Sequence, residues 1–255
     1  MSKDNHPVER AQEADASLSE LSLQGQHLSD LHFLMSHASL LTLDLSNCGQ
    51  ITDLSPLAGL TQLRILNLSN CGQITDLSPL AGLTQLTDLQ LEYCWRVRTL
   101  DALAGLTQLR TLNVSRCERI RDLRPLAGLT QLCTLDLSVC KGMGNLKLLS
   151  ELTQLTSLTI ATCERVRSIS PLGGLTRLRH LSLGYKELSD LSPLKELKQL
   201  THFSLQGGEQ LRDLRPLAEL PQLTQLSLSN CEQVRDLRPL EGLTRLTSLA
   251  LHSCR

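Results

Sequence analysis

Leucine alternates with polar residues in short segments that recur at a regular interval along the chain. The stretch from Leu43 to Leu63 reads LDLSNCGQITDLSPLAGLTQL, and from Leu45 onward it returns unchanged at Leu68 to Leu86. An alternation with a period of two is typical of a β-strand that buries one face. The pattern therefore predicts about eleven short strands, all running in the same direction. Their centres are Leu21–Leu23, Leu43–Leu45, Leu66–Leu68, Leu89–Leu91, Leu112–Val114, Leu135–Leu137, Leu158–Ile160, Leu181–Leu183, Phe203–Leu205, Leu226–Leu228 and Leu249–Leu251.

The second half of each copy predicts a short helical turn. Ser55 followed by Pro56 favours a helix start, with serine as the N-cap and proline at the first helical position. Gly59 then ends the turn, so the helix has one or two turns or is a 3-10 segment. We expect an α/β solenoid, a horseshoe or arc, with a parallel concave sheet and these turns on the convex side. Residues 18–255 form the solenoid with a truncated last repeat, and residues 1–17 are a polar N-terminal segment or cap.

Cysteine marks the same place in most copies. Six of these cysteines are spaced 23 residues apart, Lys186 and Gly208 then hold the slot, and one step is 22 residues. Disulfide scaffolds and zinc sites have irregular or paired spacings, so we interpret the cysteines as reduced, buried thiols that join neighbouring coils. This structural ladder comprises Cys48, Cys71, Cys94, Cys117, Cys140, Cys163, Cys231 and Cys254.

Composition narrows the classes of partner. The formal net charge is −1, without the basic surplus of a nucleic-acid-binding protein. There is no apolar run long enough to insert into a membrane and no secretory signal at the start, so we expect a cytoplasmic protein, with non-classical export left open.

These motifs resemble the leucine-rich-repeat superfamily over residues 18–255. Ile51 to Leu63 resembles the repeats of bacterial internalins and of the related phosphatase-regulatory class. Ser46 to Asp53 resembles the cysteine-containing subtype of F-box proteins and of trypanosome proteins described as putative adenylate cyclase regulators. The resemblance implies the fold and a role in binding, and it names no partner.

Most outward-facing residues of the predicted sheet are small and neutral, so the exceptions are the candidate partner-binding residues. Tyr, Trp and Arg are enriched at interface hot spots. The first cluster is Asp88, Gln90, Glu92, Tyr93, Trp95 and Arg116, and the second is His180, Tyr185 and His202. Two alternatives stay open: Trp95 folds over the edge turn against Arg96 or Arg98, and the histidine pair is either a metal site or a solvated contact surface.

A row of charges follows the cysteines along the same edge. The basic residues are Arg98, Arg121, Arg167, Arg212 and Arg235, and they are interleaved with Glu118, Glu164, Glu209 and Glu232. Such mixed charge is typical of a solvated, self-compensating flank, and an anionic partner is the alternative.

The sequence predicts a non-enzymatic scaffold that binds a protein or peptide on its concave face, without a cofactor or metal. One alternative is a structural array that self-associates through its uncapped C-terminal end. Another is the recognition arm of a larger signalling protein, for example one that regulates a cyclase or phosphatase. A cysteine-dependent enzyme is disfavoured because no histidine recurs beside the cysteines.

Overall fold

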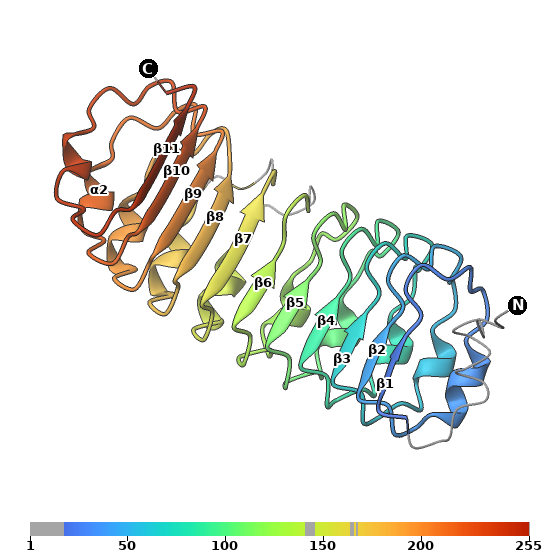
Figure 1. Ribbon diagram of the computed structural model, residues 1–255. Coiled ribbons are helices and arrows are strands. Elements are labelled where there is room, and N and C mark those ends of the chain that lie inside the picture. The colour runs from blue at the N-terminus through green and yellow to red at the C-terminus, as the bar shows by residue number, and fades with distance from the viewer. Residues whose placement is uncertain (1–17, 141–145, 164–165, 167, 255) are drawn as a thin grey trace, which may run out of the picture. The chain divides into compact units, whose positions relative to one another are not determined.

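The computed structural model describes residues 18–140, 146–163, 166 and 168–254. The predicted segment 1–17 lies outside the described residues. The chain divides into two compact units, residues 1–129 and 130–255. Within each unit, the strands of the sheet follow one another in chain order (Figure 1).

The described residues of the first unit form five strands and five 3-10 turns, one of each in every repeat. The strands are β1 (Glu20–Ser22), β2 (Thr42–Asp44), β3 (Ile65–Asn67), β4 (Asp88–Gln90) and β5 (Thr111–Asn113). The turns are η1 (His32–Ser36), η2 (Ser55–Leu57), η3 (Ser78–Leu80), η4 (Asp101–Leu103) and η5 (Arg124–Leu126). Neighbouring strands are parallel and in register, so that Leu43 pairs with Leu66 and Leu66 with Leu89.

The second unit continues the same arrangement with longer strands. The strands are β6 (Thr134–Asp136), β7 (Ser157–Ala161), β8 (His180–Gly184), β9 (His202–Gln206), β10 (Gln225–Ser229) and β11 (Ser248–His252). The helical turns are η6 (Lys147–Glu151), η7 (Ser170–Gly174), η8 (Ser192–Glu196), α2 (Arg215–Ala218) and η9 (Arg238–Leu240). The predicted parallel sheet and the predicted short turns are both confirmed.

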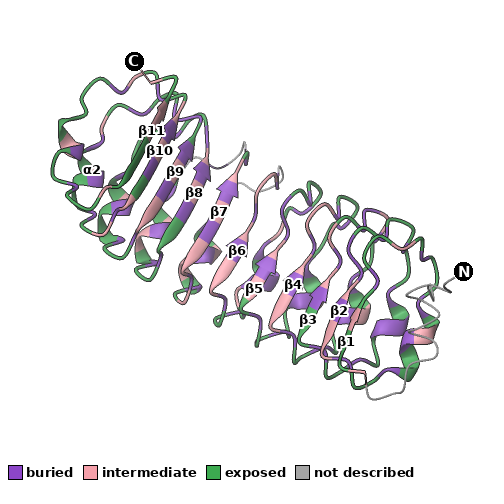
Figure 2. Ribbon diagram, viewed as in Figure 1, coloured by how far each residue is buried: buried purple, intermediate pink, exposed green. Residues whose placement is uncertain are grey.

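The core of each unit is a stack of leucines. In β4, Leu89 is buried while Asp88 and Gln90 on either side are half-exposed, which is the alternation that the sequence predicts (Figure 2). Phe203, 2% exposed, is the one phenylalanine among the buried hydrophobic residues. The polar residues of the strands leave one face of the sheet open to solvent, and we call this the open face.

An aspartate two residues earlier, rather than the predicted serine, accepts the free backbone N–H at the start of η2, η3, η5, η8, α2 and η9, while Thr99 does so at η4 and Ser168 at η7. The Asp53 carboxylate accepts hydrogen bonds from the Ser55 backbone N–H and hydroxyl, each at 2.8 Å. The N-cap position itself is Leu54, which makes no side-chain cap bond. The bonds from Ser55 hold the pKa of Asp53 below its ordinary value. The serine prediction was wrong because the Asp53 side chain, two residues before Ser55, folds back and accepts the free backbone N–H of Ser55.

Seven of the eight ladder thiols lie buried between successive coils, and Cys254 is half-exposed. The Cys94 thiol donates to the Leu68 carbonyl of the preceding coil, with Sγ and O 3.2 Å apart. The same bond joins Cys48 to Leu23, Cys71 to Leu45, Cys117 to Leu91, Cys163 to Leu137 and Cys254 to Leu228. Cys140 and Cys231 also contact a carbonyl of their own coil, that of Ser138 and Ser229 respectively. The bonds to Leu23, Leu45, Leu68, Leu91, Leu137 and Leu228 therefore each join a turn to the coil before it.

Tyr185, and not Lys186, holds the ladder slot in the eighth repeat. Tyr185 is 4% exposed, whereas the Lys186 side chain is 82% exposed and forms an ion pair with Glu209. One residue is missing between the end of β8 and the slot, and this is why that repeat is short. A Cβ atom at Gly184 would lie 2.8 Å from the Thr162 nitrogen, so the shortened turn requires glycine there.

Candidate partner-binding surface

The residue before each ladder slot places a side chain at the edge of the sheet. Tyr93 and Arg116 hold this position in neighbouring repeats, and both have a φ of 60°. Left-handed backbone is unusual for such residues. The Arg116 guanidinium lies over the Tyr93 ring, 4.7 Å from its centroid. The two side chains therefore form a cation–π pair across the repeats.

Trp95 lies beside this pair and is 45% exposed. Its indole covers the backbone of Gly72 in the preceding repeat, so closely that a Cβ atom at Gly72 would collide with the ring. Trp95 thus folds over the edge turn, as one alternative proposed, but its support is Gly72 rather than Arg96 or Arg98. The packing fixes one face of the ring and leaves nearly half of the side chain for a partner.

Tyr93, Trp95 and Arg116 line an open cavity of about 500 Å³ together with Glu118 and Arg119. We call these five residues the edge-turn patch. The cluster predicted from the sequence did not include Arg119. The repeat length contained the signal, because Arg119 lies 23 residues after Arg96 and belongs to the turn beside Trp95.

Three residues of the first predicted cluster lie outside the edge-turn patch. Gln90 donates a hydrogen bond to the Asp88 carboxylate at 2.8 Å, so these two side chains pair with each other on the open face. Glu92 is half-buried, and its backbone carbonyl accepts the Asn70 N–H at 2.7 Å. None of the three lines the cavity of the edge-turn patch.

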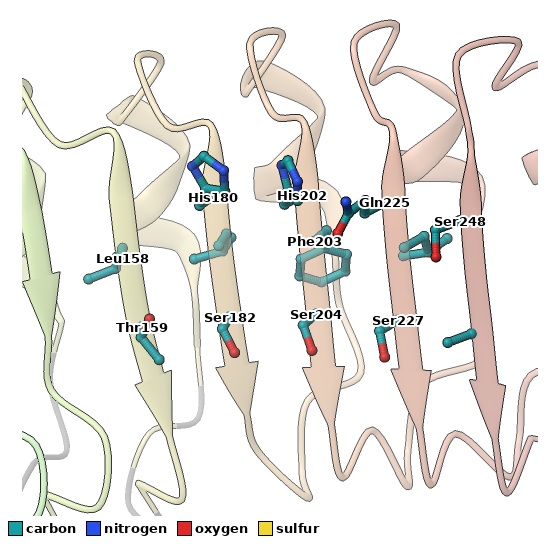
Figure 3. A pocket seen from close by; sticks show the side chains of 13 residues that line it. Leu158, Thr159, His180, Ser182, His202, Phe203, Ser204, Gln225, Ser227 and Ser248 are labelled. Atoms are coloured by element: carbon teal, nitrogen blue, oxygen red, sulfur yellow. The ribbon is translucent and has the colours of Figure 1, made fainter.

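The second predicted cluster separates in the same way. His180 and His202 are in register on β8 and β9, and their rings stack with centroids 4.3 Å apart (Figure 3). Burial lowers the pKa of His180, and the neighbouring His202 and Arg179 lower it further. Tyr185 does not join them, because its side chain is buried in the ladder slot and its hydroxyl has no hydrogen-bond partner among the described residues. Tyr185 therefore does not lie on the surface with the two histidines with which it was grouped.

Around the stacked histidines the open face carries mostly small side chains. Ser182, Ser204 and Ser227 follow one another across three strands, and with the histidines they line a cavity of about 190 Å³ (Figure 3). The stacked rings turn their faces, not converging nitrogens, toward each other. Within the described part of the chain, no three His, Cys, Asp or Glu residues gather into a metal-binding group.

Comparison with known proteins agrees with this fold. Residues 38–82 match the family model described as leucine rich repeats, in two copies. The structure is similar to an internalin, InlF, of Listeria monocytogenes, with 23% identity, a TM-score of 0.61 and coverage of 96% of this chain and 93% of that one. No sequence among curated proteins matches the chain significantly.

Two further solved structures are informative in different ways. The functional domain of InlJ from Listeria monocytogenes, which includes a cysteine ladder, has 23% identity and a TM-score of 0.63 over 94% of this chain and 54% of that one. A plant peptide hormone receptor, RGFR1, in complex with RGF2 has 16% identity and a TM-score of 0.60 over 95% of this chain and 49% of that one. At these identities the likeness shows the fold alone. No helix among the described residues is long and apolar enough to cross a bilayer.

Proposed function

We propose that this leucine-rich-repeat protein is a non-enzymatic binding module that recognises a protein or peptide partner through the edge-turn patch. The observation that supports the proposal is the cluster itself. An exposed tryptophan, a tyrosine and an arginine are held together by packing and a cation–π contact. Rigid aromatic and arginine side chains are the residues that dominate interface energies.

The position differs from the concave-face site that the sequence predicts. Side chains on the open face are mostly serine, threonine, asparagine and aspartate, which offer few anchors. The edge-turn patch lies beyond the strand ends, where the solenoid can present large side chains without disturbing the leucine core. The repeat framework is thus the support, and the irregular fourth and fifth repeats supply the contact.

The state of the cysteines supports a role without catalysis. Burial raises the pKa of Cys71 and of Cys94 to about 12, and that of Cys163 and of Cys231 to about 11. A nucleophilic cysteine needs its thiolate form, which these values make negligible at neutral pH. A thiol that donates to a carbonyl suits a structural bond.

The test is affinity purification with mass spectrometry from cells that express the chain. The variant is Tyr93→Asn with Trp95→Gly, which restores the residues of the second and third repeats and so preserves the framework. The matched control is Val139→Asn with Glu232→Gly, which changes the same two slots elsewhere. We expect the specific partners of the wild type to be recovered with the control and lost with the variant. Equal recovery by all three proteins would refute the proposal.

A further inference from the structure

The edge-turn patch is surrounded by arginines that lack an acidic partner. Arg96, Arg98, Arg119 and Arg121 are all exposed, and none forms an ion pair with another described residue. Arginines of the helical turns behave differently. Arg124, for example, pairs with Asp122 at 2.7 Å. In the described part of this surface the arginines outnumber the one acidic residue that lines the patch, Glu118, so the charge near Trp95 is a positive surplus.

The arginines are continuous with the tryptophan. Arg119 lines the cavity of the edge-turn patch and also a second open cavity, about 450 Å³, that Arg98 and Arg121 line with Asp122. Because Asp122 is already occupied by Arg124, the free charge along this path is positive. We call Arg98, Arg119 and Arg121 the basic flank.

Arginine is not a fixed part of the repeat, although the slot of Arg98 and Arg121 also holds Arg167, Arg212 and Arg235 in later repeats. The slots of Arg119 and Arg121 hold Gln50 and Thr52 in the second repeat, and Gln73 and Thr75 in the third. The framework thus folds with neutral residues at these positions. The arginines are additions to it, and they coincide with the only tryptophan of the chain.

We infer that the edge-turn patch and the basic flank together bind an acidic peptide segment, whose carboxylates meet the arginines while an apolar side chain packs on Trp95. This inference rests on the proposed function and specifies its partner. Arginine binds carboxylates through a planar fork of N–H donors, and complementary charge speeds encounter and gives specificity.

A peptide fits the surface better than a nucleic acid. Glu118 lines the edge-turn patch together with Arg116 and Arg119, so a polymer with a negative charge on every unit would bring negative charge against this carboxylate. A peptide can place a neutral residue opposite Glu118 and acidic residues opposite the arginines. The formal net charge of the chain, −1, also favours a short peptide that carries both charged and neutral residues over a polyanion.

The experiment is selection of a random dodecapeptide phage library on the immobilised full chain. A parallel selection uses a variant in which the basic flank is returned to framework residues, Arg98→Thr, Arg119→Gln and Arg121→Thr. The control is Arg235→Thr, an equivalent slot in another repeat. Binding of the enriched peptides and of a single-stranded oligodeoxynucleotide is then measured by the fluorescence of Trp95 at about 0.05 and 0.5 M NaCl.

We expect enriched peptides to carry net negative charge and an apolar residue. Their affinity should fall roughly fivefold or more in the flank variant and at high salt, and should be unchanged in the control. Three results would overturn the inference: no enrichment, enrichment without acidic residues, or tighter binding of the oligonucleotide. If partners are still lost with Tyr93→Asn and Trp95→Gly but not with the flank variant, the proposed function stands and the acidic partner fails.

Discussion

Backbone conformation at single residues separates the framework from its exceptions. Asn47 and Asn70 precede the ladder slot in the second and third repeats, each with a φ of 62°. Asparagine tolerates the left-handed region, whereas other L-residues pay roughly 1–2 kcal/mol there. Tyr93, Arg116 and Val139 adopt the same conformation with φ near 60°. At Tyr93 and Arg116 the strain accompanies the edge-turn patch, as it often accompanies function.

Val139 provides a stability test that is independent of the patch. We expect Val139→Asn to raise the free energy of unfolding by about 1 kcal/mol, because a β-branched residue is costly at positive φ. Denaturant unfolding monitored by circular dichroism measures the change. Asn70→Val is the reverse control and should lower the stability by a similar amount. An unchanged or lower stability of Val139→Asn would contradict the strain at this turn.

At the residue scale, the sequence revealed the ladder but not the conformation that precedes it. Cysteine spacing located the slot because every copy needs one buried group there. It misplaced the slot in the eighth repeat, where counting selects Lys186 although burial of an unpaired lysine is unfavourable. In the structure the eighth repeat lacks the residue with positive φ that precedes the slot elsewhere, and Tyr185 is buried in the slot in place of Lys186. The unusual Gly184 was the available signal.

Strands and turns were predictable as elements because each is specified many times. The alternation of leucine with polar residues defines the strand in every copy, and the sheet register follows from stacking like on like. The cap of the turns was missed because Ser55 and Asp53 are both good caps, and only geometry shows which one bonds the free N–H. Repetition therefore specifies the framework, while choices between equivalent side chains need coordinates.

The pairing of β8 with β9 predicts a pH dependence. His180 faces His202 across the sheet with Arg179 beside it, and Thr201 bonds His202. Because the folded pKa of His180 is lowered, its contribution to stability is present above the unfolded pKa of about 6.5 and is lost as pH falls below it. We expect the free energy of unfolding to decrease between about pH 7 and pH 5.

His180→Gln isolates this effect, since Gln225 occupies the equivalent position of β10. The variant should show a shallower loss of stability over the same pH range, measured by thermal unfolding at fixed ionic strength. His27→Gln, at an exposed residue in the other unit, serves as the control. A pH profile identical for wild type and His180→Gln would refute the assignment.

At the scale of the molecule, the fold is compatible with many functions, so the proposed function is argued from the irregular repeats and not from the fold. The sequence located Tyr93, Trp95 and Arg116 because they are aromatic or charged in an otherwise bland framework. It also grouped them with Asp88 and Gln90, which the structure assigns to the open face. Closeness in the sequence does not show whether a side chain belongs to the strand, as those of Asp88 and Gln90 do, or to the turn that follows it. Self-association through the end of the sheet stays a prediction.

The central claim is that a partner contacts the edge-turn patch. Hydrogen–deuterium exchange of the chain, alone and with its captured partner, tests this most directly. We predict slower exchange in residues 92–98 and 115–121 when the partner is bound, and no such change for Tyr93→Asn with Trp95→Gly. Protection confined to the open face of β7 to β10, with residues 92–98 and 115–121 unchanged, would contradict the account.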